Sequence, residues 1–256
     1  NTWSVRTTAL GEPVERFYEF DLQYVLDNDL KKLPFKESPC SSQDHYTIVT
    51  ISAPTKNSPT NKSLDKIKTE LASIYRQSLR ANEMDLYVAG EPLSFEEYPI
   101  LEAPFARNPK GDIVRWKKEI DFKFGKYRAQ GFIAILREIN NTQNGLVLLR
   151  RGRVIVGAET DGRYFPKSLF GTQGNFRFKR LFGELELEGF EVSFNKNDIQ
   201  DKENLEALME ALKGEIHTKD FDLYAQADEY RLDETRKVVK KLVKKHDTSA
   251  KNNRSE

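Results

Sequence analysis

The sequence predicts an α+β fold in which strands, a helix, mostly antiparallel strands and a last helix follow one another. Three observations lead to this prediction. Apolar and polar residues alternate in short runs bounded by turn residues, which is typical of half-buried strands. One amphipathic stretch between breaker residues has the three- and four-residue spacing of a helix. The 256 residues are 38% hydrophobic and 11% aromatic, enough to fill one large core or two modest ones.

The first fifty residues favour three strands, at 3–8, 17–22 and 46–51, and Pro54 ends the third. A breaker-rich linker follows at 57–61. Ser63 is then predicted to cap a helix. The apolar face of this helix consists of Leu64, Ile67, Leu71, Ile74, Tyr75 and Leu79.

The middle of the chain combines irregular and strand-like stretches. A short strand is expected at 84–89, and four prolines predict an irregular, exposed loop over 91–112. Two hairpins are then predicted, one around Gly125-Lys126 and one around Arg150-Arg151-Gly152-Arg153. In the second hairpin Gly152 supplies the positive φ of a tight turn. The hairpin strands are expected at 120–124 and 129–136, then at 146–149 and 154–156.

The last third predicts a strand pair over 182–194, after a loop between strands that holds Gly171 and Gly174. A helix is expected to open near Asp201 and to include 204–212. From Phe221 the pattern is again helical, with a valine and leucine stripe among the lysines of 237–245, and the polar end 248–256 is expected to be disordered.

The turn Phe194-Asn195-Lys196-Asn197-Asp198-Ile199 is the most informative stretch, because it places one lysine between a strand and a helix. An ammonium beside the N–H groups of a helix start is suited to neutralise a phosphate of a bound nucleotide. Turn chemistry alone favours another interpretation, a solvated connection with an Asx cap. The motifs that precede the turn decide between the two.

Six short motifs occur in a recognisable order. They are Thr-Ile-Val-Thr-Ile at 47–51, the helix end 74–79, Gly90-Glu91-Pro92-Leu93, the Arg-Arg-Gly-Arg hairpin, Phe182-Gly183-Glu184-Leu185 and Asn195-Lys196-Asn197-Asp198. This order resembles the second half of a GHKL ATPase, the superfamily of gyrase B, the heat-shock chaperone ATPases, MutL and MORC. The nearest similarity is to MORC-like proteins, whose transducer ends its sheet in Asn-Lys-Gln-Asp-Phe; this chain has Asn197 and Ile199 at the third and fifth positions.

The resemblance implies a fold, a site and a set of ligands. Residues 1–53 would be the final strands of a Bergerat-type nucleotide-binding sheet, 54–215 a β-α-β transducer sandwich, and 216–256 a helical extension with a disordered tail. Lys196 would contact the γ-phosphate of ATP, flanked by Asn195 and Asn197. ATP and Mg²⁺ would be the ligands of the full-length protein, in which the transducer couples nucleotide state to domain closure or dimerisation.

The family's pocket motifs are absent from this sequence: the helix with a catalytic Glu and a Mg²⁺-binding Asn, the Asp-x-Gly-x-Gly turn and the Gly-rich lid. We therefore expect a fragment that lacks its N-terminal ATPase half and that, alone, holds no cofactor and hydrolyses no ATP. A start without a charged or strongly apolar leader, with no membrane-length apolar run, favours a cytoplasmic protein that contacts no membrane. One cysteine and three scattered histidines give no zinc spacing, so no metal is expected.

Two alternatives stay open. The chain could be a DNA-binding module whose basic surface consists of Arg150, Arg151, Arg153, Lys179 and Arg180, although a net charge of +1 gives no bulk attraction to DNA and a solvated hairpin tip explains the same cations. It could also be an interaction scaffold or homodimer that uses its lysine-rich C-terminal helix.

Overall fold

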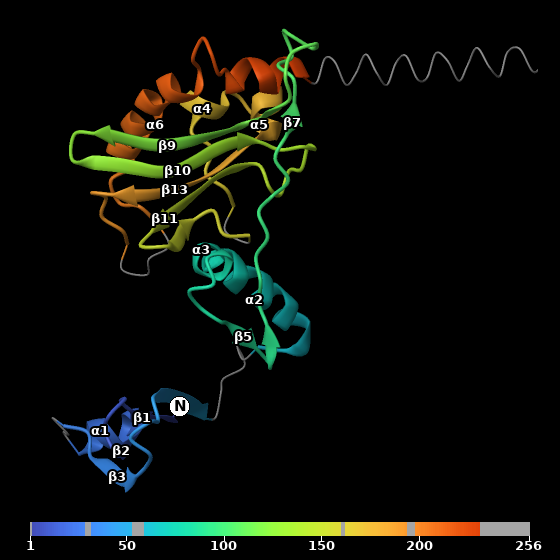
Figure 1. Cartoon of the computed structure of the whole chain (residues 1–256). Coiled ribbons are helices and arrows are strands. Elements are labelled where there is room, and N and C mark those ends of the chain that lie inside the picture. Colours follow the sequence, from blue (N-terminus) through green and yellow to red (C-terminus); the bar gives the residue numbers. More distant parts are fainter. Residues whose placement is uncertain (1, 29–31, 53–58, 160–161, 194–197, 231–256) are drawn as a thin grey trace, which may run out of the picture. The chain divides into compact units, whose positions relative to one another are not determined.

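The computed structural model describes residues 2–28, 32–52, 59–159, 162–193 and 198–230 (Figure 1). The chain forms two compact units, Asn1–Leu64 and Asp65–Glu256. Helices and predominantly antiparallel strands occur together, so the predicted α+β class is confirmed. The domain limits at residues 53 and 215 stay predictions.

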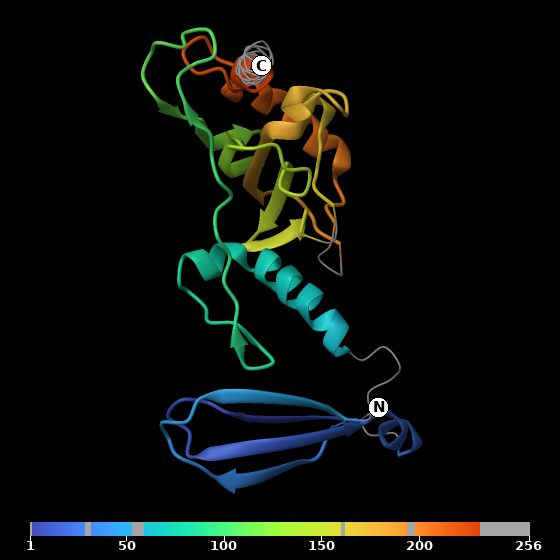
Figure 2. The same ribbon diagram turned by 90° about the vertical axis from the view of Figure 1, so that its right-hand side faces the viewer.

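The first unit is a four-stranded antiparallel sheet with the order β3-β2-β1-β4 (Figure 2). Its elements are β1 (Thr2–Thr8), β2 (Val14–Asp21), α1 (Leu22–Asp27), β3 (Phe35–Pro39) and β4 (Tyr46–Ser52). The three predicted strands are confirmed, and β3 and α1 are additional. Helix α1 begins where the Asp21 carboxylate accepts the backbone N–H groups of Gln23 and Tyr24, at 2.9 and 3.2 Å.

Two consecutive helices open the second unit, α2 (Asn61–Ile74) and α3 (Arg76–Arg80). Helix α2 begins before Ser63, so the prediction that Ser63 caps it is wrong. The carbonyl of Thr60 accepts the N–H of Leu64 at 3.1 Å. Ser63 lies in the first turn, where its Oγ accepts the Thr60 N–H at 2.8 Å and satisfies one of the donors left free at a helix start.

The second unit is built around a five-stranded sheet with the order β12-β11-β13-β10-β9. β11 and β13 run parallel, and the other neighbours run antiparallel. Both predicted hairpins are confirmed, and in the second turn Arg151 joins Gly152 at positive φ (53° and 73°), as a two-residue type I′ turn requires. The strands are β9 (Lys117–Phe124), β10 (Tyr127–Ile135), β11 (Gly145–Arg150), β12 (Arg153–Val156) and β13 (Leu181–Glu188).

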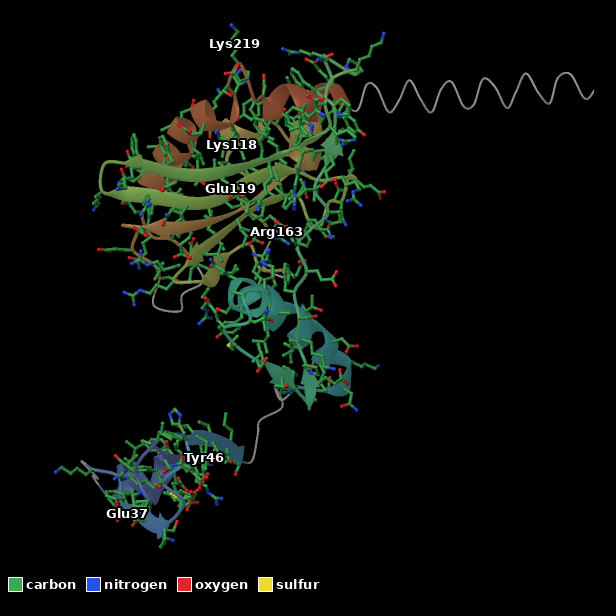
Figure 3. All side chains as sticks on the ribbon, in the orientation of Figure 1. Glu37, Tyr46, Lys118, Glu119, Arg163 and Lys219 are labelled. Atoms are coloured by element: carbon green, nitrogen blue, oxygen red, sulfur yellow. The ribbon has the colours of Figure 1, made fainter. Side chains whose placement is uncertain are left out.

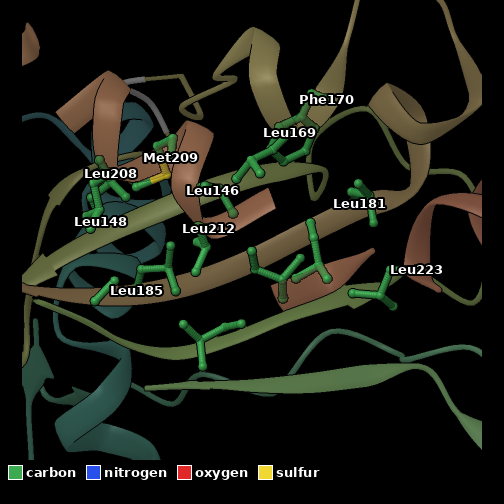
Figure 4. Close-up of a cluster of buried hydrophobic side chains, with 14 of the residues drawn as sticks. Leu146, Leu148, Leu169, Phe170, Leu181, Leu185, Leu208, Met209, Leu212 and Leu223 are labelled. Carbon is green, nitrogen blue, oxygen red and sulfur yellow. The ribbon is translucent and has the colours of Figure 1, made fainter. Parts of the chain in front are cut away.

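Helices cover both faces of this sheet (Figure 1). One face packs against α4 (Lys167–Phe170), α5 (Phe176–Arg180) and α6 (Lys202–Ile216). The core between them contains buried leucines, Met209 and Phe170 (Figure 4). The other face packs against α2 and α3 through a smaller cluster that includes Ile74.

Three expectations for the second unit are corrected. The segment 91–112 is not exposed throughout, because Ile100 and Leu101 are buried and Ile100 bridges Leu136. The second strand expected within 182–194 is reduced to an isolated bridge between Val192 and Ile199. The loop at 171–175 joins two short helices rather than two strands. The short strands of the unit are β5 (Tyr87–Val88), β6 (Glu91–Pro92), β7 (Glu102–Ala103) and β8 (Val114–Arg115).

Residues 223–230 are helical and pack into the core of the second unit, so the helical pattern predicted from Phe221 is confirmed up to residue 230. The disorder expected at 248–256 falls on residues outside the described part of the chain. Within the described part, we find no helix with the length and apolarity needed to span a bilayer.

Candidate functional site

The predicted phosphate-contacting residues Asn195, Lys196 and Asn197 lie outside the described residues, but both ends of their turn are described. Ser193 and Asp198 face each other across it. The Ser193 N–H donates to the Asp198 carbonyl at 2.9 Å, and the Asp198 N–H donates to Ser193 Oγ at 3.2 Å. The lysine is therefore carried by a four-residue connection whose ends are hydrogen-bonded to each other, not by a simple strand-to-helix turn.

Both limbs of this connection are anchored in the core. Phe190 precedes it, is buried, and stacks on Tyr127 of β10 with ring centroids 4.3 Å apart. Ile199 follows it and is also buried. Buried anchors on each side fix the two ends relative to the sheet.

The start of α6 carries its own anion. Asp201 is the N-cap, and its carboxylate accepts the Asn204 N–H at 3.3 Å and the Tyr127 hydroxyl at 2.6 Å. The hydrogen bond from Tyr127, followed by that from Asn204, lowers the pKa of Asp201. Asp201 therefore already accepts one of the backbone N–H groups of this helix start, that of Asn204.

Strand β13, which leads to this connection, carries two carboxylates on the face that packs against α2 and α3. Glu186 accepts the backbone N–H groups of Arg151 and Gly152, the latter at 3.0 Å. The tip of the β11–β12 hairpin is thereby fixed to the last third of β13. Arg150 adds a hydrogen bond of 3.2 Å to the Leu187 carbonyl.

Glu184 binds two arginines of α3. Arg76 donates to Glu184 at 3.2 Å, and Arg80 donates to both oxygens of the same carboxylate. Arg76 is fully buried, its Nε donates to the Ser73 carbonyl at 2.8 Å, and its guanidinium lies 4.3 Å from the ring centroid of Phe95. Burial lowers the pKa of Arg76, and the charge of Glu184 opposes that shift. Helix α3 is thus held on β13 by a buried ionic network.

The same network continues away from β13. The hydroxyl of Ser73 accepts the Glu159 N–H at 3.2 Å, and the Glu159 carboxylate pairs with Arg163 at 3.0 Å. Arg163 lies on the α2–α3 side of the sheet (Figure 3). Together these contacts connect α2, α3, β13 and the segment after β12, so a displacement of one element is opposed by the others.

The structure does not bring the predicted basic residues together. Arg151 is exposed at the hairpin tip, but Arg150 and Arg153 are half-buried, and Arg153 lies 5.8 Å from the Tyr75 ring centroid. Arg180 is buried, so its place on a basic surface is corrected. Lys179 and Arg180 directly precede the start of β13. The tip of the β11–β12 hairpin contacts Glu186, near the end of β13, so the two groups of basic residues lie at opposite ends of this strand. The described residues contain no group of three His, Cys, Asp or Glu side chains placed to hold a metal ion.

No protein-family model and no curated protein matches the sequence. Among solved structures, the chain is similar to the ATPase domain of the mismatch repair endonuclease MutL from Aquifex aeolicus, with 14% identity and a TM-score of 0.42 over 84% of this chain and 76% of that one. It is also similar to the B subunit of DNA gyrase from Myxococcus xanthus, with 10% identity and a TM-score of 0.41 over 83% and 65% of the two chains. We base the functional proposal on the chain's own residues.

The sequence interpretation missed the four charged residues that connect α3 and the hairpin to β13. Two signals were available. Arg76 and Arg80 are four residues apart on one helix face, and Glu184 and Glu186 are two residues apart on one strand face. Neither signal shows that the two arginines pair with Glu184, because Glu184 lies more than a hundred residues away from both of them in the sequence.

Proposed function

We propose that this chain is the transducer part of a GHKL-type ATPase and that its first unit completes a nucleotide-binding domain supplied by a further segment. In this proposal ATP and Mg²⁺ are held by that segment. Lys196 approaches the terminal phosphate when the two parts close, and closure or dimerisation is the output. The ordered sequence motifs and two properties of the described structure support it.

The observation that carries the proposal is the unfinished packing of the first unit. One face of its sheet is apolar across the strands, because Trp3 is opposite both Phe20 and Ile51 in the register. Yet no hydrophobic side chain among the unit's described residues is buried, and Ile51 and Val49 are 68% and 60% exposed. The remaining members of this face are Val5, Tyr18 and Phe35.

A sheet of four strands gains its stability from burying one face against another layer. Burial of apolar surface stabilises a fold by roughly 25 cal/mol per Å², and this stabilisation is missing for surface that stays in water. The apolar face of β1–β4 therefore calls for a covering layer. A nucleotide-binding domain to which these strands belong would provide one.

The second supporting property is the frame around Lys196. Hydrogen bonds between Ser193 and Asp198 close the connection that carries the lysine, and β13 is fixed to both α3 and the hairpin. In this proposal the cation meets the phosphate only when the two parts close. It then stabilises charge that develops on the terminal phosphoryl group, which couples cleavage to geometry.

The test uses the protein in which this chain is joined to its nucleotide-binding segment. Lys196→Ala should lower kcat for ATP hydrolysis by well over tenfold, as expected for the loss of one preorganised charge contact. The far-ultraviolet circular dichroism should not change. Lys219→Ala is the matched control, since Lys219 is exposed on the loop after α6 (Figure 3) and its removal should leave kcat unchanged. Unchanged turnover in Lys196→Ala would remove the assignment.

The DNA-binding alternative gains no support from the structure. The five basic residues proposed for it are divided between the two ends of β13, and one of them is buried. A surface that tracks a phosphate backbone needs its cations in one exposed stripe. We therefore do not propose it as a second function.

A further inference from the structure

A groove of 730 Å³ lies on the helical side of the second unit, between the segment Tyr164–Ser168 and α6. Helices α4 and α6 are neighbours there (Figure 1). One wall is the exposed face of α6, with Glu203, Glu206, Ala207 and Glu210. These positions follow the helical spacing of three, four and seven residues, so they form one continuous stripe.

Both walls of the groove are preformed. The opposite face of α6 is buried in the main core through Leu205, Leu208 and Met209, so this helix cannot turn freely. Tyr164 exchanges two backbone hydrogen bonds with Leu146 of β11, at 2.9 and 3.0 Å. Phe165 stacks on Phe178 with ring centroids 4.3 Å apart. A fixed aromatic and proline wall thus faces a fixed acidic wall.

The groove is acidic, with three carboxylates and one ammonium, that of Lys167. Among the described residues, neither Glu203 nor Glu206 has an ion-pair partner, and Glu210 has only Lys213 at 3.9 Å. Burial, and secondarily the charge of Glu206, raises the pKa of Tyr164 to about 12. The phenol is therefore a neutral hydrogen-bond donor at physiological pH. A ligand that fits must combine cations with apolar side chains.

We propose that this groove holds residues 237–245 of the same chain. That segment reads Lys-Val-Val-Lys-Lys-Leu-Val-Lys-Lys, five lysines around a valine and leucine stripe. As a helix it would place Lys237, Lys240 and Lys244 at positions i, i+3 and i+7, the same spacing as that of Glu203, Glu206 and Glu210 on α6. Its apolar stripe would then lie on Tyr164 and Phe165.

The connection is long enough. Tyr224 donates its hydroxyl to the carbonyl of Ser168, a residue that lines the groove, at 3.1 Å. From there the helix continues to Tyr230, a rise of about 9 Å for six residues. Residues 231–236 can span up to about 20 Å when extended. The segment can return to the groove of its own molecule, and no second chain is required.

The test uses the full chain with Cys40→Ser, so that no native thiol remains. Ala207→Cys in the groove and Val239→Cys in the segment are joined by a short bismaleimide, and products are separated by electrophoresis under denaturing conditions and located by peptide mass. We expect a fast cross-link within one chain. Replacing Glu203, Glu206 and Glu210 by Gln should slow it about tenfold, the combined effect of three exposed ion pairs each worth about twofold. High salt should act in the same direction.

Glu215→Gln is the matched control, because Glu215 is exposed near the other end of α6 and does not line the groove. It should leave the cross-linking rate unchanged. A product that joins two chains would overturn the intramolecular assignment in favour of exchange between copies. A rate that is independent of the three glutamates, or equal to that of a cysteine placed at Glu188, would overturn the groove as the site.

Discussion

At the scale of single residues, the carboxylate of Glu184 matters most, because it forms ion pairs with two arginines at once. The side chain of Arg76 is fully buried and that of Arg80 is 25% exposed. Moving a guanidinium out of water is costly unless an anion and further hydrogen bonds replace the lost hydration. Glu184, Ser73 and the Phe95 ring together provide that replacement.

Glu184→Gln should therefore destabilise the second unit by about 3–5 kcal/mol, the usual cost of leaving a buried charge without its partner. The measurement is urea unfolding followed by circular dichroism. Glu188→Gln is the control, since Glu188 is on the same strand but exposed. A loss of less than about 1 kcal/mol for Glu184→Gln, the range of exposed ion pairs, would show that the network contributes little.

At the scale of elements, the start of α6 depends on the ionised form of Asp201. Hydrogen bonds lower the pKa of Asp201 in the folded state. A carboxylate with a lowered pKa stabilises the fold at any pH above its unfolded value, and this contribution disappears as the pH falls through the folded value. The stabilising effect is therefore complete at neutral pH and absent in strong acid.

Asp201→Asn keeps a residue type that can cap a helix but removes the titration. The variant should be less stable than the parent at pH 7, and the difference should shrink below about pH 4 as Asp201 of the parent becomes protonated. Urea midpoints recorded from pH 7 to pH 3 check this. A difference that is constant over the whole range would show that the carboxylate's charge is not involved.

The local sequence pattern was sufficient to predict some elements of the fold but not others. The two hairpins were predictable because alternation and a tight turn lie within about twenty residues of each other. The burial of Ile100 and Leu101 was not, because it depends on Leu136 and Ile135, which lie on β10 or directly after it. The prolines around them suggested only an exposed loop.

The candidate site, too, could be predicted from the sequence only in part. The turn residues that carry Lys196 can be recognised from sequence order, and the helix start at Asp201 from cap chemistry. The pairing of Val192 with Ile199 could not be, since residues 190–193 alternate like a full strand. In the structure these residues do not join a sheet; they pair only with the segment that directly follows the connection, through the bridge between Val192 and Ile199.

At the scale of the whole molecule, the two units differ in how far their packing is complete. The second has a large buried core, whereas the first has an apolar sheet face without buried hydrophobic side chains among its described residues. The two tryptophans report on this difference, because Trp116 is buried in the second unit and Trp3 is 36% exposed in the first.

Acrylamide should therefore quench the Trp3 fluorescence of this chain, obtained as the difference between the parent and Trp3→Phe. In the protein joined to its nucleotide-binding segment, the same quenching constant should fall several-fold, because a covering layer removes the indole from water. Trp116 is the internal reference and should stay protected in both. Equal quenching of Trp3 in the two proteins would contradict the proposed docking of the first unit.

The central position of β13 also has a consequence for how the chain acquires its structure. Its neighbours are β10 and β11, and residue 135 pairs with 181 while 145 pairs with 182. Chain entropy opposes such distant pairings until both partners are present, which makes them slow to form. During synthesis the two hairpins can form early, but the sheet stays divided until residue 188 has left the ribosome. The edges of β10 and β11 are exposed to other nascent chains throughout that interval.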